Sequence, residues 1–86
     1  MVTESFQEYK GFIIRLRAVT NNGFWYSIIK TMKNESSPDG VKNCYLSKKG
    51  FNFIAPLDLL SRAKKHIDNH EGDLNAKYQQ YLLKQI

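Results

Sequence analysis

The chain has 86 residues, with thirteen basic against eight acidic side chains and a net charge of +5 at neutral pH. A chain this short forms one domain with a modest core and leaves no room for a deep substrate cleft. No convergent set of acid, base and nucleophile is present, so we expect neither an enzyme nor a small-molecule substrate. The one cysteine, Cys44, excludes an intramolecular disulfide and a multi-thiolate metal site.

No apolar stretch approaches the roughly 20 residues of a membrane span, and the first residues lack the apolar core of a signal peptide. We therefore expect a cytoplasmic protein without a membrane partner. His66 and His70 are four residues apart and could approach one metal ion, but two ligands define a metal site only loosely. A partial positive charge on a histidine is favourable near the end of a helix, which explains both residues without a metal. No cofactor is therefore expected.

The first element is expected to be a strand from Tyr9 to about Thr20, after a loose lead-in of residues 1 to 8. Gly11 is expected to mark a bulge or a point of close backbone approach near the start of this strand. Hydrophobic and other side chains alternate along the strand, so its two faces differ. One face carries Phe12, Ile14 and Leu16. Arg15 and Arg17 then lie on the opposite face and make it basic.

A second strand, from about Phe24 to Lys33, follows at once and predicts a β-hairpin. A two-residue turn at Asn22-Gly23 places Lys30 and Tyr26 on the basic face. A three-residue loop shifts the second strand by one residue and places Trp25 there instead. The sequence does not choose between these two registers, but both arginines keep their face in each.

A polar turn at residues 34 to 40 is expected to lead to a third strand, from Val41 to about Ser47. Lys48-Lys49-Gly50 interrupts that run as a basic loop that could touch phosphate, so the strand either ends there or bends and continues through Phe51 to Phe53. Pro56 suits the first position of a helix, and hydrophobic residues recur at helical spacing as far as about Asp68.

Residues 69 to 72 are expected to end that helix, and a last helix is expected from Leu74 to about Gln85. The expected fold is therefore α+β: a three-stranded antiparallel sheet backed by one helix, with an additional C-terminal helix at residues 73 to 86. All 86 residues are expected to form a single small domain.

The positive charge is concentrated in the sheet half, because residues 9 to 55 hold eight basic and only two acidic side chains. A basic sheet face beside an aromatic ring suits a nucleic-acid backbone, so we expect a nucleic-acid-binding or accessory module for DNA or RNA. The expected binding residues are Arg15, Arg17, Trp25, Tyr26, Lys30, Lys48 and Lys49.

The alternative is a protein-interaction or homodimerisation module, because apolar side chains exposed on a small domain are typical of interfaces. Its contacts would come from the apolar part of the same sheet and from one face of the last helix. The residues expected at this interface are Ile13, Met32, Tyr78, Tyr81 and Leu82.

The order of elements from residue 9 to about residue 69 is a strand, an Asn-Gly turn, a strand with Trp25, a third strand and a helix. That helix carries Leu60, Ala63, Lys64 and Ile67. This pattern resembles the AP2-like module of three strands and one helix at the N-terminus of phage tyrosine recombinases. The sheet of such a module enters a DNA groove, so the resemblance implies DNA contacts for Arg15, Arg17, Lys30 and Trp25.

Overall fold

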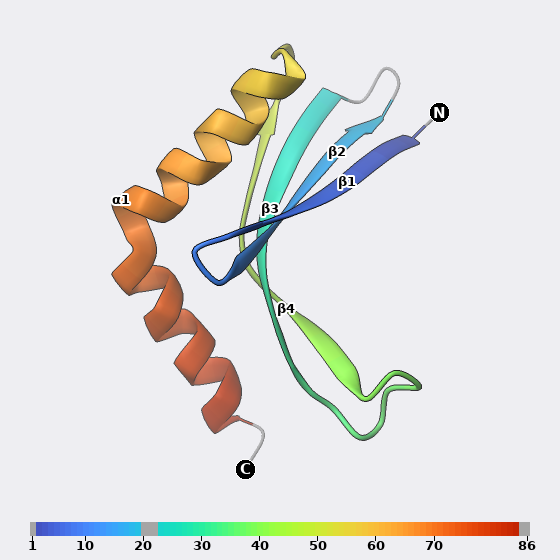
Figure 1. Cartoon of the computed structure of the whole chain (residues 1–86), viewed down its shortest axis with the longest axis vertical. Coiled ribbons are helices and arrows are strands. Elements are labelled where there is room, and N and C mark those ends of the chain that lie inside the picture. The colour runs from blue at the N-terminus through green and yellow to red at the C-terminus, as the bar shows by residue number, and fades with distance from the viewer. Residues whose placement is uncertain (1, 20–22, 85–86) are drawn as a thin grey trace.

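The computed structural model describes residues 2–19 and 23–84. These residues form a four-stranded antiparallel sheet in the order β1-β2-β3-β4 and one long helix, which lies along one face of the sheet (Figure 1). The elements are β1 (Val2–Tyr9), β2 (Phe12–Val19), β3 (Gly23–Lys33), β4 (Val41–Phe51) and α1 (Pro56–Leu83). The α+β class is confirmed, but the expected numbers of strands and helices are wrong.

The extra strand is β1, which occupies most of the segment that was expected to be a loose lead-in. It pairs along its whole length with β2. Lys10 and Gly11 have positive φ values of 50° and 82°, so they form a tight hairpin turn and not a bulge. Asp68 of α1 holds this turn, because its carboxylate lies 2.6 Å from Lys10 Nζ and accepts a 2.9 Å hydrogen bond from Tyr9 Oη.

The register of β2 against β3 decides which side chains accompany the arginines. Arg15 lies opposite Ser27, and Arg17 lies opposite Trp25. Trp25 therefore shares the face of the arginines, as the three-residue loop predicts, and the register with Tyr26 on that face is wrong. The expected turn residues Asn21 and Asn22 lie outside the described residues.

β4 runs from Val41 to Phe51, so of the two alternatives the continuation through Lys48-Lys49-Gly50 is the one observed, and an end of the strand near Ser47 is wrong. A β-bulge at Leu46, where the register shifts between Ile28 and Ile29 of β3, lets the strand keep pairing while it bends. Pairing with β3 supplies the hydrogen bonds that a basic loop would have left to water, so these residues are extended. The polar turn before β4 is confirmed, and the amide of Asn34 donates to the carbonyl of Gly40 at 3.0 Å.

A single helix replaces the two that were expected, because α1 continues through residues 69 to 72 with only a kink at His70 (φ −130°, ψ 23°). Pro56 occupies its first turn, as predicted. A glycine such as Gly72 costs a helix only about 1 kcal/mol relative to alanine, which packing of the next turns against the sheet offsets. The kink lets both halves of α1 follow the twisted sheet, as Figure 1 shows.

The core lies between α1 and the face of the sheet that it covers. One group of buried side chains comes from β2, β3 and β4, and the other comes from one stripe of α1. The core comprises Phe12, Ile14, Tyr26, Ile28, Met32, Cys44, Leu46, Leu59, Ala63, Ile67 and Leu74. The opposite face of the sheet has no helix over it among the described residues, and we call it the open face.

Candidate nucleic-acid interface on the open face

Arg15 lies across the middle of the open face and joins three strands. Its Nη2 atom lies 2.6 Å from Glu4 Oε2 on β1, and its Nη1 atom donates to Tyr45 Oη on β4 at 3.1 Å. Ser27, its partner on β3, is only 3% exposed. A small side chain at this position leaves room for the Arg15 side chain to cross β3 and reach Tyr45. The hydrogen bond to Glu4 raises the pKa of Arg15, so this cation is held and partly neutralised by its own sheet.

Arg17, Trp25 and Lys48 form a second row on the open face, from β2, β3 and β4. The guanidinium carbon of Arg17 lies 5.6 Å from the centroid of the indole, and Lys48 Nζ lies 5.3 Å from it. Glu4 is 3.8 Å from Arg17 Nε, too far for a hydrogen bond. Lys48 has no carboxylate within 4.0 Å among the described residues. This row is therefore the less neutralised part of the face.

Both arginines also retain unused hydrogen-bonding capacity. The Nε atoms of Arg15 and Arg17 are buried and have no acceptor among the described residues. An unpaired buried donor costs about 1–3 kcal/mol, so a rearrangement that brought an acceptor to these groups would be favourable.

Three residues expected to bind nucleic acid point to the other side of the sheet. Tyr26 is 2% exposed and belongs to the core. Lys30 Nζ lies 4.8 Å and 4.9 Å from the ring centroids of Phe12 and Tyr78, between the sheet and α1. Lys49 lies next to Lys48 on an extended strand and therefore faces the helix side. The structure thus brings together only Arg15, Arg17, Trp25 and Lys48 of the seven expected residues.

Glu4 and Tyr45 belong to the site but were not among the residues expected from the sequence. Glu4 was assigned to the loose lead-in, so its pairing opposite Arg17 was not foreseen. The signal that would have revealed β1 is the glycine at position 11, which follows one β-compatible segment and precedes another. Tyr45 lies close to Arg15 because the register of β4 places it opposite Ile29 of β3, and no local sequence pattern predicts that register.

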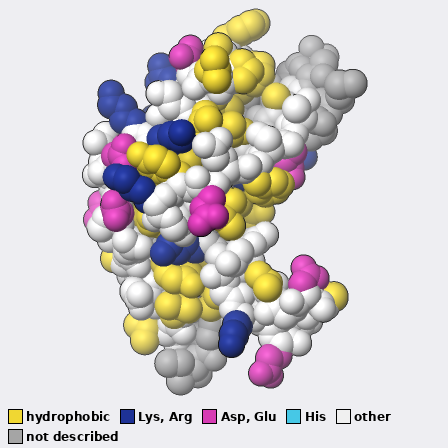
Figure 2. Space-filling view, viewed as in Figure 1, with side chains coloured by type: hydrophobic (Ala, Val, Ile, Leu, Met, Phe, Trp, Pro, Cys, Tyr) yellow, Lys and Arg dark blue, Asp and Glu magenta, His cyan; other side chains and the backbone are white. Residues whose placement is uncertain are grey.

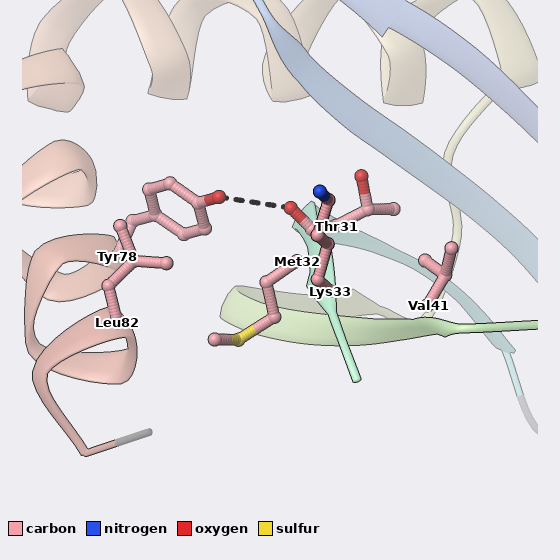
Figure 3. A pocket seen from close by; sticks show the side chains of 6 residues that line it. All are labelled: Thr31, Met32, Lys33, Val41, Tyr78 and Leu82. Atoms are coloured by element: carbon pink, nitrogen blue, oxygen red, sulfur yellow. Dashed lines mark hydrogen bonds between the residues drawn. The ribbon is translucent and has the colours of Figure 1, made fainter. Parts of the chain in front are cut away.

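The residues of the alternative interface are divided between the two faces. Ile13 lies on the open face, whereas Met32 is 7% exposed and belongs to the core. Tyr78 donates to the carbonyl of Thr31 at 3.0 Å and lines, with Leu82, a shallow groove of about 550 Å³ (Figure 3). The expected apolar stripe of the last helix therefore packs on its own sheet.

Figure 2 shows hydrophobic side chains gathered beside the C-terminal half of α1, whereas side chains of both charges intermingle over its N-terminal half. Tyr81, the remaining residue of the alternative interface, donates to the carbonyl of Tyr45 at 3.2 Å. This bond fastens the end of α1 to β4, so Tyr81 has a structural role in the single chain.

Comparison of the chain with protein-family models, curated proteins and solved structures found no match, so the site is interpreted from its own geometry. No helix of the described residues is both long enough and apolar enough to cross a membrane. Residues 2–19 and 23–84 contain no group of three or more His, Cys, Asp or Glu side chains that could hold a metal ion. His66, one of the two histidines considered for a metal, instead bonds Tyr26 Oη through Nδ1 at 2.8 Å.

Proposed function

We propose that the chain is a non-enzymatic nucleic-acid-binding module that uses the open face of its sheet. The observation that carries this proposal is the row in which Arg17 and Lys48 flank Trp25 on a sheet face without a covering helix. The row presents two cations to phosphate groups and an aromatic ring between them. Such a combination suits a phosphate backbone with a base or sugar beside it.

The energies of the competing contacts favour an exchange at Trp25. A cation over an exposed aromatic ring gains about 0.5–1 kcal/mol, whereas a base stacked on an aromatic side chain gains about 1–3 kcal/mol. An incoming base therefore displaces Arg17 or Lys48 from the ring at little cost. The displaced cation then pairs with the adjoining phosphate, which adds a charge-assisted bond.

The direct test is titration of the protein with mixed-sequence single- and double-stranded DNA and RNA at about 50 mM salt, where electrostatic binding is strong. Trp25 is the only tryptophan, so its fluorescence reports contact at the proposed site. We expect a fluorescence change on binding. The Arg17→Ala/Lys48→Ala variant should bind a labelled oligonucleotide at least about tenfold more weakly.

The matched control is Lys42→Ala/Lys84→Ala, which removes two exposed cations from elsewhere and should retain most of the affinity. The proposal fails if none of the four nucleic acids binds at low salt. It also fails if the control variant loses as much affinity as the Arg17 and Lys48 variant.

Homodimerisation through the open face is the second candidate, because three large hydrophobic side chains are exposed there. Phe6 is 60% exposed, Tyr45 is 45% exposed and Val41 is 42% exposed. A dimer held by these groups should persist as the salt concentration rises, unlike binding through phosphates. Sedimentation of the wild-type chain and of Phe6→Gln at low and high salt separates the two functions.

A further inference from the structure

A second basic site lies between β4 and the N-terminal half of α1, on the helix side of the sheet. It is a shallow pocket of about 210 Å³ whose charged lining comprises Lys49, Arg62 and Lys65, with His66 and His70 beside them. Among the residues that the structure describes, no aspartate or glutamate lines it. The sequence gives no local signal for this pocket, because Lys49 is distant in sequence from the helical residues. We call it the seam pocket.

The three cations of the seam pocket are not neutralised by the protein. Among the described residues, no carboxylate oxygen lies within 4.0 Å of Lys49, Arg62 or Lys65. Asp58 lines a neighbouring hollow together with Arg62 and Lys65, but not the seam pocket itself. By contrast, Lys10 and Arg15 elsewhere in the molecule have a carboxylate at 2.6 Å. Grouped cations without counter-charges favour an anion.

Phe51 orients two of these cations over one ring. Lys49 Nζ lies 5.9 Å from the ring centroid, and the guanidinium carbon of Arg62 lies 5.2 Å from it. Phe51 itself stacks on Tyr26, with 6.2 Å between the centroids, and Tyr26 is buried in the core. The ring is therefore fixed by the fold. Its contacts with Lys49 and Arg62 restrict these two side chains before a ligand arrives, which reduces the conformational entropy that binding costs.

His66 lines the pocket, and the positive charges around it affect its pKa. It contacts Tyr26 Oη at 2.8 Å through Nδ1 and Ser47 Oγ at 3.4 Å through Nε2, so both of its ring nitrogens are occupied. Burial is the main cause that lowers the pKa of His66, and the charges of His70 and Lys49 lower it further. An anion in the pocket would offset those charges.

We propose that the seam pocket binds a phosphoryl group. The planar fork of Arg62 matches two phosphate oxygens, and Lys49 and Lys65 supply point charges around them. The small volume suits one phosphoryl group, or two joined together, with the rest of the ligand outside. The phosphoryl group can belong to a free phosphorylated compound or to the terminal phosphate of a nucleic acid, which share this chemistry.

This site goes beyond the nucleic-acid interface of the open face, because the two share no cation. Lys48 and Lys49 are neighbours in β4, but they point to opposite faces of the sheet. Binding at the seam pocket can therefore be tested with pyrophosphate alone, without any nucleic acid. Its failure would leave the function of the open face unaffected.

The experiment is an NMR titration of the whole chain with pyrophosphate, at constant ionic strength set with sodium chloride. We expect saturable shifts of the ring protons of His66 and His70 and a rise in the pKa of His66 at saturation. Arg62→Gln/Lys65→Gln should weaken binding at least about tenfold, since two charge-assisted contacts are lost. Lys42→Gln/Lys84→Gln, which removes the same charge elsewhere, should leave the affinity within about twofold.

Two further titrations compare a short oligonucleotide with a 5′-phosphate and the same oligonucleotide with a 5′-hydroxyl group. A preference for the phosphorylated end that the Arg62 and Lys65 variant removes assigns the site to nucleic-acid ends. Saturable binding of pyrophosphate without that preference assigns it to a free phosphorylated compound. Shifts that never saturate, or that the double variant leaves unchanged, overturn the proposal.

Discussion

Replacing Glu4 with glutamine is expected to strengthen nucleic-acid binding, because Glu4 is the carboxylate that neutralises the open face. Its Oε2 atom lies 2.6 Å from Arg15 Nη2 and 3.8 Å from Arg17 Nε. Glutamine keeps the shape of the side chain and removes its charge. Arg15 then becomes available to a phosphate, in addition to Arg17 and Lys48.

The size of the effect follows from the number of phosphates that the face can neutralise. Each contact to B-form DNA changes the slope of log K against log salt by about −0.9. Two available cations therefore give the wild type a slope of about −1.8, and three give Glu4→Gln about −2.7. Between 50 and 200 mM salt, the affinity should fall about 12-fold for the wild type and about 40-fold for Glu4→Gln. Arg17→Ala/Lys48→Ala should show almost no salt dependence from this face.

The assay is fluorescence anisotropy of a labelled duplex at four or more salt concentrations. The matched control is Glu8→Gln, which removes the same charge from the same strand and the same face. Glu8 lies opposite Ile13 and has no basic group within 4.0 Å among the described residues. Its slope should stay near the wild-type value.

An unchanged slope for Glu4→Gln would refute the reasoning, because Arg15 would then take no part in binding. An equal gain for Glu8→Gln would refute it as well, since net charge alone would explain the effect. The stability of Glu4→Gln should change by only about 1 kcal/mol or less, because the ion pair is partly exposed and screened by solvent. Thermal unfolding of the variant checks this condition.

Three further predictions concern the fold. Gly23→Ala should lower the free energy of unfolding by about 2 kcal/mol or more, since Gly23 has φ +93° and its added Cβ would lie 2.8 Å from a backbone oxygen. The control is Gly50→Ala, whose added Cβ would meet nothing closer than 3.8 Å. Denaturant titrations compare the two variants, and equal losses in the free energy of unfolding would contradict the prediction. A hydrogen bond from Lys10 lowers the pKa of Asp68. The ionised Asp68 therefore stabilises the folded chain above the ordinary carboxyl pKa of about 3.9, and this contribution is lost as the pH falls and Asp68 becomes protonated. The melting temperature of Asp68→Asn should therefore be below that of the wild type at pH 7 but equal to it near pH 2. A difference in melting temperature that persists in acid would show that the charge of Asp68 is not its cause. Burial raises the pKa of Cys44, which is 2% exposed, so thiol reagents should label it only when the chain unfolds; rapid labelling under native conditions would show that β4 opens locally.

The sequence by itself determined the elements whose signals are local. Alternation along residues 12 to 19 gave β2 two different faces and put Arg15 and Arg17 on one of them. The polar residues from 34 to 40 gave the turn before β4, and Pro56 gave the start of α1. Each of these features depends on a few neighbouring residues and on steric preferences that act within them.

Tertiary structure alone decided which faces the remaining side chains share. β1 is a strand only because β2 offers its edge, and Lys48-Lys49-Gly50 is extended only because β3 pairs with it. The two halves of α1 form one helix because the sheet gives both an apolar surface to cover. A shift of one residue in a strand exchanges its faces, so register, which long-range pairing sets, placed Trp25 with the arginines and Tyr26 in the core.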